Sequence, residues 1–105
     1  KVFIAAAGMA AHLAGAVAAH STKPVIGIPI ESGGMGGIDS LLSTAMMPPG
    51  VPVATVAVGK SGAKNSAILA VQILATSDDD LARKLKEYKE NMRAEVLEKD
   101  KQLNS

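Results

Sequence analysis

The chain has 105 residues, 11 Lys and Arg against 10 Asp and Glu, a net charge of +1 and no Cys. This length predicts a single hydrophobic core, and an apolar content of 48% excludes the composition of a disordered chain. The near-neutral charge gives no electrostatic support for a nucleic-acid partner. The lack of Cys excludes disulfides, thiolate metal sites and Cys nucleophiles, and it fits a reducing compartment.

The first part of the chain alternates apolar runs with segments of small residues. Val2–Ala6 is a short, continuous apolar run, which is typical of a strand buried on both faces. Ala10–Ala19 has the composition of a helix, and Val25–Ile28 forms a second buried run. The Gly-rich stretch Pro29–Gly37 is predicted to be a mobile loop, and Ile38–Thr44 a short helix.

The same alternation continues toward the middle of the chain. Pro52–Val58 is a third run rich in β-forming residues, and Gly62–Ala75 is predicted to be a helix. Strands without a polar face that alternate with helices indicate an α/β fold, in which helices cover both faces of a parallel sheet.

The end of the chain carries most of the charge, since only four of the 21 charged residues precede Lys60. We expect residues 1–77 to form the α/β core and residues 78–105 a long amphipathic helix that Ser77 caps. The pair Arg83 and Glu87 has the spacing of an ion pair on its polar side. Its apolar stripe is predicted to pack on its own or a neighbouring subunit, and it consists of Leu81, Leu85, Tyr88, Met92 and Val96.

Two segments suggest functions that we do not favour. The apolar stretch from Val2 to Ala19 has the length of a signal peptide or membrane span, but Ala and Gly contribute little transfer energy and His12 interrupts it. Gly59-Lys60-Ser61 resembles the end of a phosphate-binding loop, but Ala54 stands where that motif requires Gly. We therefore expect no membrane association and no nucleotide hydrolysis.

His12 is the sharpest candidate for chemistry. It follows Gly8 at the point where a buried strand gives way to a helix, which is where parallel α/β sheets bind ligands. An imidazole at this position can donate or accept a proton near neutral pH. A structural histidine whose proton is bound by a backbone carbonyl is the alternative.

The most specific sequence motifs lie in five segments, namely Ala6–Gly15, Lys23–Pro29, Gly37–Ser43 with Met47-Pro48, Pro52–Ala57 and Ala63–Ala70. In this order they resemble the N5-carboxyaminoimidazole ribonucleotide mutase family of purine biosynthesis, also described as the catalytic subunit of phosphoribosylaminoimidazole carboxylase. The resemblance implies a flavodoxin-like three-layer α/β/α domain that assembles as an octamer with active sites between subunits. It also implies a cytoplasmic enzyme without a metal or other cofactor.

An enzyme of this family moves a carboxylate from the exocyclic nitrogen to C4 of an aminoimidazole ribonucleotide, through release and recapture of CO2. The resemblance assigns His12 as the catalytic residue and residues 31–47 as a mobile loop that covers the site. The substrate-binding residues that it implies are Ala7, Gly8, Met9, Ala10, Ala11, Leu13, Ser43 and Met47.

Some positions depart from the family pattern. Met46 stands where the family usually has Gln, and Ala14 stands where Pro is common. A second branch of the family, which carboxylates the aminoimidazole ribonucleotide with CO2 directly, carries Ser-Asn in place of Ala11-His12, so this pair favours the mutase branch.

The resemblance extends over the C-terminal two-thirds of the family. We therefore expect the family's Gly-Ser phosphate-binding loop, its Ser-Ala-His-Arg loop and its first strands to be absent here, and the isolated chain to be inactive. The alternatives to a mutase are a direct carboxylase of the same family and a non-catalytic module whose C-terminal helix mediates assembly.

Overall fold

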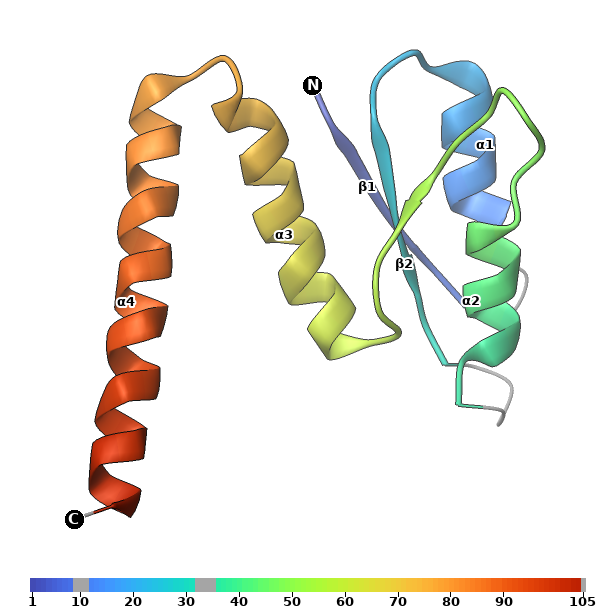
Figure 1. Cartoon of the computed structure of the whole chain (residues 1–105). Helices are drawn as coiled ribbons and strands as arrows, with labels where there is room; N and C mark the ends of the chain where they lie inside the picture. The colour runs from blue at the N-terminus through green and yellow to red at the C-terminus, as the bar shows by residue number, and fades with distance from the viewer. Residues whose placement is uncertain (9–11, 32–35, 105) are drawn as a thin grey trace. The chain divides into compact units, whose positions relative to one another are not determined.

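A computed structural model describes residues 1–8, 12–31 and 36–104, with the side chain of His12 excepted (Figure 1). The chain divides into two compact units, residues 1–70 and 71–105.

The first unit is built on three parallel strands in the order β1-β2-β3. Strand β1 spans Phe3–Ala7, β2 spans Val25–Pro29 and β3 spans Ala54–Thr55. All five residues of β2 are buried, as expected of the central strand of a parallel sheet. Since consecutive strands are neighbours and run the same way, each connection must cross over the sheet.

Helices α1, His12–His20, and α2, Ile38–Ala45, make these two crossovers and lie side by side (Figure 1). The buried cluster beneath α1 joins Ala5 of β1, Ala14 of α1 and Val25 of β2. The small side chains at these contacts let the helix backbone approach the sheet closely.

Gly27 in the centre of β2 marks the closest approach between the sheet and its helices. A Cβ placed there would lie 2.5 Å from Cγ2 of Thr44 in α2 and 2.9 Å from Cγ1 of Val53. The Cβ of Ala14 in α1 would be 3.4 Å away. Both helices therefore meet the same face of β2, and only the lack of a side chain at residue 27 makes room for them.

The third strand is shorter than predicted, because Ala54–Thr55 forms the ladder where Pro52–Val58 was expected. The backbone nevertheless stays beside β2: the amide of Val56 donates to Gly27 O at 3.2 Å and that of Gly59 to Pro29 O at 2.9 Å. Proline has no amide to donate to a sheet ladder, and Gly59 adopts a positive φ of 79°, which leaves the extended conformation.

The remaining expected elements form within one or two residues of the predicted bounds. Helix α3 spans Lys60–Ala75, and it begins with a close approach in which Gly62 packs against the carbonyl of Ala57. Strands and helices that alternate along the chain, with all strands parallel, confirm the predicted flavodoxin-like α/β class.

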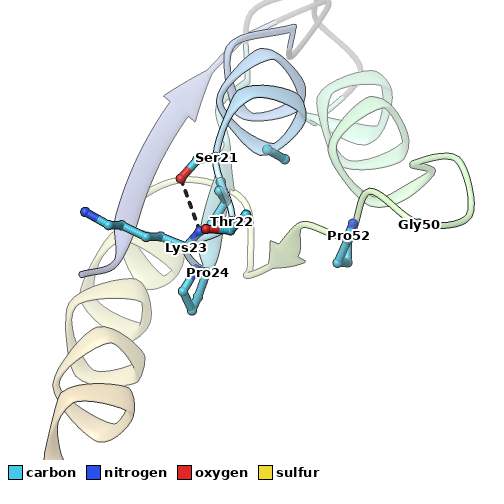
Figure 2. Close-up of a pocket in the computed structure, with 8 residues that line it drawn as sticks. Ser21, Thr22, Lys23, Pro24, Gly50 and Pro52 are labelled. Atoms are coloured by element: carbon cyan, nitrogen blue, oxygen red, sulfur yellow. Dashed lines mark hydrogen bonds between the residues drawn. The ribbon is translucent and has the colours of Figure 1, made fainter.

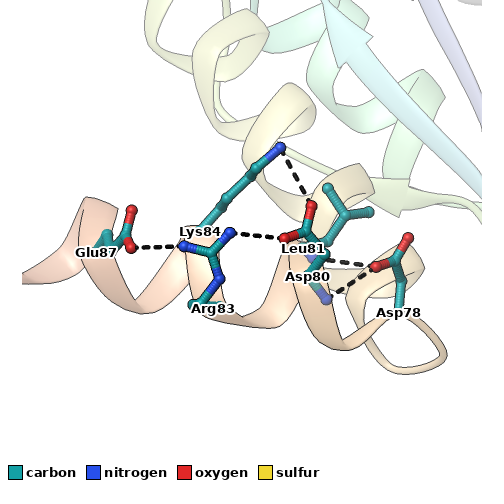
Figure 3. A network of polar contacts seen from close by, with 6 residues as sticks. All are labelled: Asp78, Asp80, Leu81, Arg83, Lys84 and Glu87. Carbon is teal, nitrogen blue, oxygen red and sulfur yellow. Dashed lines mark hydrogen bonds and ion pairs between the residues drawn. The ribbon is translucent and has the colours of Figure 1, made fainter.

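Helix α4 spans Asp79–Leu103, and its first turn is capped by Asp78 (Figure 3). The prediction that Ser77 caps the helix is wrong by one residue. The Asp78 carboxylate accepts hydrogen bonds from the amides of Asp80 and Leu81, both at 3.1 Å, whereas the Ser77 amide still donates to the carbonyl of Leu74. An ionised carboxylate also complements the positive end of the helix dipole.

Ion pairs follow this cap along the exposed face of α4 (Figure 3). Arg83 bridges Asp80 at 2.7 Å and Glu87 at 2.9 Å, which confirms the predicted pair with Glu87. Lys84 lies 3.3 Å from the other oxygen of Asp80. No residue of α4 is buried within this chain. In its apolar stripe, Met92 and Val96 are exposed, whereas Leu81, Leu85 and Tyr88 are half-buried.

The apolar N-terminal stretch forms a five-residue strand and a nine-residue helix. Across residues 1–8, 12–31 and 36–104, we find no helix with both the length and the apolar character needed to traverse a bilayer.

Candidate functional site

The carboxyl ends of the three strands are tied together at one edge of the sheet. The amide of Ile30, one residue beyond β2, donates to the carbonyl of Ala7, the last residue of β1, at 3.0 Å. The amide of Gly59 donates to Pro29 O from the other side. Parallel α/β sheets bind ligands at this edge, and the sequence analysis predicted the site at the end of β1, which lies here.

The loop that leads from β1 into α1 begins at this edge. Ala7 and Gly8 are half-buried, and His12 is the first residue of α1. Of the other predicted site residues, Met9, Ala10 and Ala11 lie outside the described residues, as does the His12 side chain. The backbone therefore carries His12 to the predicted edge, and its role as a catalytic residue stays a prediction.

Two further candidates lie on α2 and just after it, and the second of them, Met47, contacts α1. Met47 follows α2 and is half-buried, and a Cβ placed on Gly15 would lie 3.4 Å from its Cε and 3.6 Å from its Sδ. Gly15 is three residues after His12, so the end of α2 lies beside the first turns of α1. Ser43, one turn before Met47, is exposed, as is Leu13 on α1.

A pair of buried hydroxyl groups holds α2 and was not singled out from the sequence. Ser40 Oγ donates to the carbonyl of Ile30 at 2.8 Å, and Thr44 Oγ1 donates to the carbonyl of Ser40 at 2.7 Å. Both side chains are buried against the sheet. Their spacing of four residues is the sequence signal that places both side chains on one face of the helix, and the structure shows that this face is the buried one.

The segment Gly59-Lys60-Ser61 does not have the features of a phosphate-binding loop. The Gly59 amide already donates to Pro29 O, and its carbonyl accepts the first helical hydrogen bond of α3, from Ala63, at 3.0 Å. A phosphate-binding loop instead presents free amides to its ligand. This segment is a strand-to-helix turn, as the missing Gly at position 54 predicted.

A cavity lies at the opposite edge of the sheet, where β2 and β3 begin (Figure 2). Its volume is about 550 Å³, and it is lined by Ala18, Ser21, Thr22, Lys23, Pro24, Val25, Gly50 and Pro52. Val25 is the first residue of β2 and the other lining residues precede β2 or β3, so the cavity is at the amino ends of these strands. The Lys23 side chain extends away from Gly50 and Pro52 (Figure 2). The Ser21 hydroxyl accepts a hydrogen bond from the backbone amide of Lys23 at 3.1 Å.

Among the side chains that the structure describes, the titratable groups with perturbed pKa values lie on α4. Hydrogen bonds from Arg83 and Lys84 lower the pKa of the Asp80 carboxyl, and the same contact with Asp80 raises that of Arg83. Among the described residues, no three His, Asp or Glu side chains come together as a metal site requires.

Comparison with known proteins extends the sequence resemblance. The family profile for AIR carboxylase matches residues 1–95. The N5-carboxyaminoimidazole ribonucleotide mutase of Bacillus subtilis is 57% identical over 103 residues, which cover 98% of this chain and 64% of that protein. The mutase of Thermotoga maritima is 53% identical over 98% of this chain and 59% of its own length.

The mutase of Escherichia coli is 50% identical over 93% of this chain and 58% of its own length. The chain thus spans about three-fifths of the curated relatives that it matches. The family profile covers the sheet, the crossover helices and most of α4, and the parallel α/β fold agrees with it. The chain belongs to the AIR carboxylase family.

Proposed function

We propose that the protein carrying this chain converts N5-carboxyaminoimidazole ribonucleotide into 4-carboxy-5-aminoimidazole ribonucleotide, a step of purine biosynthesis. The observation that carries this proposal is an identity of 50–57% to relatives named as mutases for that ribonucleotide. The carboxyl edge of the sheet supports it, because β1 ends there at Ala7 and the first turn of α2 is hydrogen-bonded there through Ser40.

The proposed reaction requires one group that first donates a proton and then accepts one. The bond between the exocyclic nitrogen and the carboxylate breaks to release CO2, and the nitrogen keeps the electron pair and takes a proton from His12. The ring carbon C4 then attacks CO2, and neutral His12 removes the C4 proton, so that no proton is gained or lost overall. A site that excludes water keeps CO2 in place between the two steps.

Small residues and α2 would bind the substrate in this scheme. Ala7 to Ala11 leave room for the aminoimidazole against the backbone, and Leu13 gives an apolar contact on the first turn of α1. Ser43 offers a hydroxyl, and Met47 borders Gly15 in the next turn of α1. The scheme uses no metal or other cofactor and no nucleic acid.

We also propose that the protein is a cytoplasmic homo-oligomer, with the octamer as its expected form. Large apolar side chains that are exposed on α2, among them Ile38, Leu42 and Met46, support a covered surface there. The stripe on α4 supports the assignment of residues 78–105 as a helix that packs on its own or a neighbouring subunit. Light scattering with size-exclusion chromatography tests the assembly, and a monomer would contradict it.

The test of the reaction uses the natural protein that carries this chain. We expect it to convert N5-carboxyaminoimidazole ribonucleotide without ATP or added metal. A protein that instead requires aminoimidazole ribonucleotide and CO2 is a direct carboxylase. A protein that binds and converts neither ribonucleotide but still assembles is a non-catalytic module, and the proposal is then wrong.

A further inference from the structure

Ile30 is held from two sides at the carboxyl edge of the sheet. Its amide donates to the carbonyl of Ala7 at 3.0 Å, and its own carbonyl accepts the Ser40 hydroxyl at 2.8 Å. Ser40 is only 1% exposed, and Ala7 is the last residue of β1. A short chain of hydrogen bonds therefore connects the end of β1, through the end of β2, to the first turn of α2.

The start of α2 depends on this contact more than most helix starts do. Its N-cap residue, Gly37, has a φ of 84° and provides no side-chain hydrogen bond to the first turn. The Ser40 hydroxyl instead donates a hydrogen bond to the carbonyl of Ile30, ten residues earlier, and so joins this turn to the end of β2. Thr44, one turn later, is buried on the same face, and its hydroxyl bonds within the helix to Ser40 O.

The far end of α2 is attached separately, where Met47 borders Gly15 of α1. The first turn of α2 is thus hydrogen-bonded to the sheet through Ser40, Thr44 packs on Gly27 of β2, and Met47 contacts α1 just beyond the last turn. Ser43 lies between the attachments at Ser40 and Met47 and is exposed. Because a helix of eight residues moves as a rigid rod, loss of either attachment shifts the residues between them.

We propose that Ser40 is a positioning residue for the ribonucleotide site. Its hydroxyl sets the place of α2 against the carboxyl ends of β1 and β2, and thereby the place of Ser43 and Met47 relative to Ala7 and Gly8. This inference rests on the proposed function, which assigns substrate contacts to those four residues. Ser40 itself does not touch the substrate.

Ser66 offers a matched control for a substitution at Ser40. Ser66 is also 1% exposed, and its Oγ donates to a backbone carbonyl, that of Ala63, at 2.7 Å. That bond stays within α3 and joins no second element. Ser40→Ala and Ser66→Ala therefore remove the same buried hydroxyl and the same kind of hydrogen bond, and only the first removes a hydrogen bond between α2 and the sheet.

The kinetic test compares both variants in the natural protein that carries this chain. We expect Ser40→Ala to raise KM for the carboxyaminoimidazole ribonucleotide about tenfold and to leave kcat within about twofold, since the loss of one partly buried hydrogen bond is worth about that factor. Helix α1, which carries His12, keeps its packing on the sheet in this variant. Ser66→Ala leaves both constants unchanged, and Ser40→Cys, which nearly keeps the volume, replaces Ser40→Ala if that variant does not fold.

Hydrogen exchange without substrate separates this inference from the proposed function. We expect the amides of Ile30 and Leu41 to exchange about tenfold faster in Ser40→Ala than in Ser66→Ala. If exchange and KM are alike in the two variants, or if exchange rises while KM does not, Ser40 is not a positioning residue and the proposed function stands. If the unsubstituted protein has no turnover, the proposed function fails, and the positioning role fails with it.

Discussion

The thioether of Met47 lies against Gly15, with its Cε 3.4 Å from the place where a Cβ on that glycine would stand. Gly15 is in the second turn of α1, and Met47 follows the last turn of α2. A flexible side chain thus fills the space beside a glycine, so the two crossover helices touch near His12 without a rigid contact. Gly27 of β2 differs, because the branched side chains of Thr44 and Val53 lie against it.

These two glycines predict substitutions of opposite sign. Gly15→Ala adds an ordinary contact with a side chain that can adjust, and it stabilises the chain by about 0.5–1 kcal/mol because alanine favours the helix. Gly27→Ala places a methyl group 2.5 Å from Cγ2 of Thr44, and the overpacking costs about 1–3 kcal/mol or more. Chemical denaturation measures both, and equal effects of the two substitutions would contradict the close approach at Gly27.

His12→Ala is expected to reduce turnover of the proposed reaction about 10²–10⁴-fold, the usual contribution of a general acid–base group. The fold and the oligomeric state are expected to stay as they are, because His12 is the first residue of its helix. The control is His20→Ala at the other end of α1, where the side chain is exposed. Steady-state kinetics of both variants decide the matter, since unchanged rate constants in His12→Ala would leave this histidine with a structural role alone.

The cap of α4 can be tested with two neighbouring aspartates. Asp78→Ala removes a carboxylate that accepts two amides at 3.1 Å, and it destabilises the helix by about 1 kcal/mol. Asp79→Ala changes the same charge in the first turn without removing the cap, so a smaller effect is expected. Thermal unfolding followed by circular dichroism at 222 nm distinguishes the two, and a greater loss in Asp79→Ala would mean that Asp78 is not the cap.

The pH dependence of α4 follows from Asp80. Hydrogen bonds from Arg83 and Lys84 lower the pKa of this carboxyl below 3.8, its value in an unfolded chain. The stabilisation is therefore complete above that pH and is lost as the pH falls through the lower pKa of the folded chain. We expect helicity at 222 nm to decrease with acid over this range, and less steeply in Asp80→Asn. The contact is exposed, so salt weakens it, and an identical acid profile in Asp80→Asn would contradict its role.

Local pattern was enough to predict most elements of the fold. The apolar runs predicted the bounds of the two long strands, and the apolar stripe predicted those of α4, to within one or two residues. The expected burial on both faces holds for β2 but is wrong for β1, an edge strand in which only Ala5 is buried. The third strand came out shorter, since the length of a strand depends on its partner. Only Ala54 and Thr55 pair in register with β2, and Gly59 turns away through a positive φ.

In the candidate site, too, some residues were predicted from the sequence and others were found only in the structure. His12 was selected from its place after a buried strand, and the backbone puts it at the first residue of α1. Ser43 and Met47 were selected through the family resemblance, and the meeting of Met47 with Gly15 required the packed helices. Ser40 was not selected, because a serine in a short helix looks the same in sequence whether its hydroxyl faces water or a strand.

The amino-acid sequence by itself determined the order of strands and helices, the α/β class and the position of a histidine at the end of a strand, since each depends on residues that are close in the chain. The tertiary structure alone decided that Ser40 donates to Ile30, that Gly27 admits two helices and that Met47 reaches α1. These contacts join residues that are ten or more positions apart, and only the packing of α1 and α2 on one face of β2 brings them together.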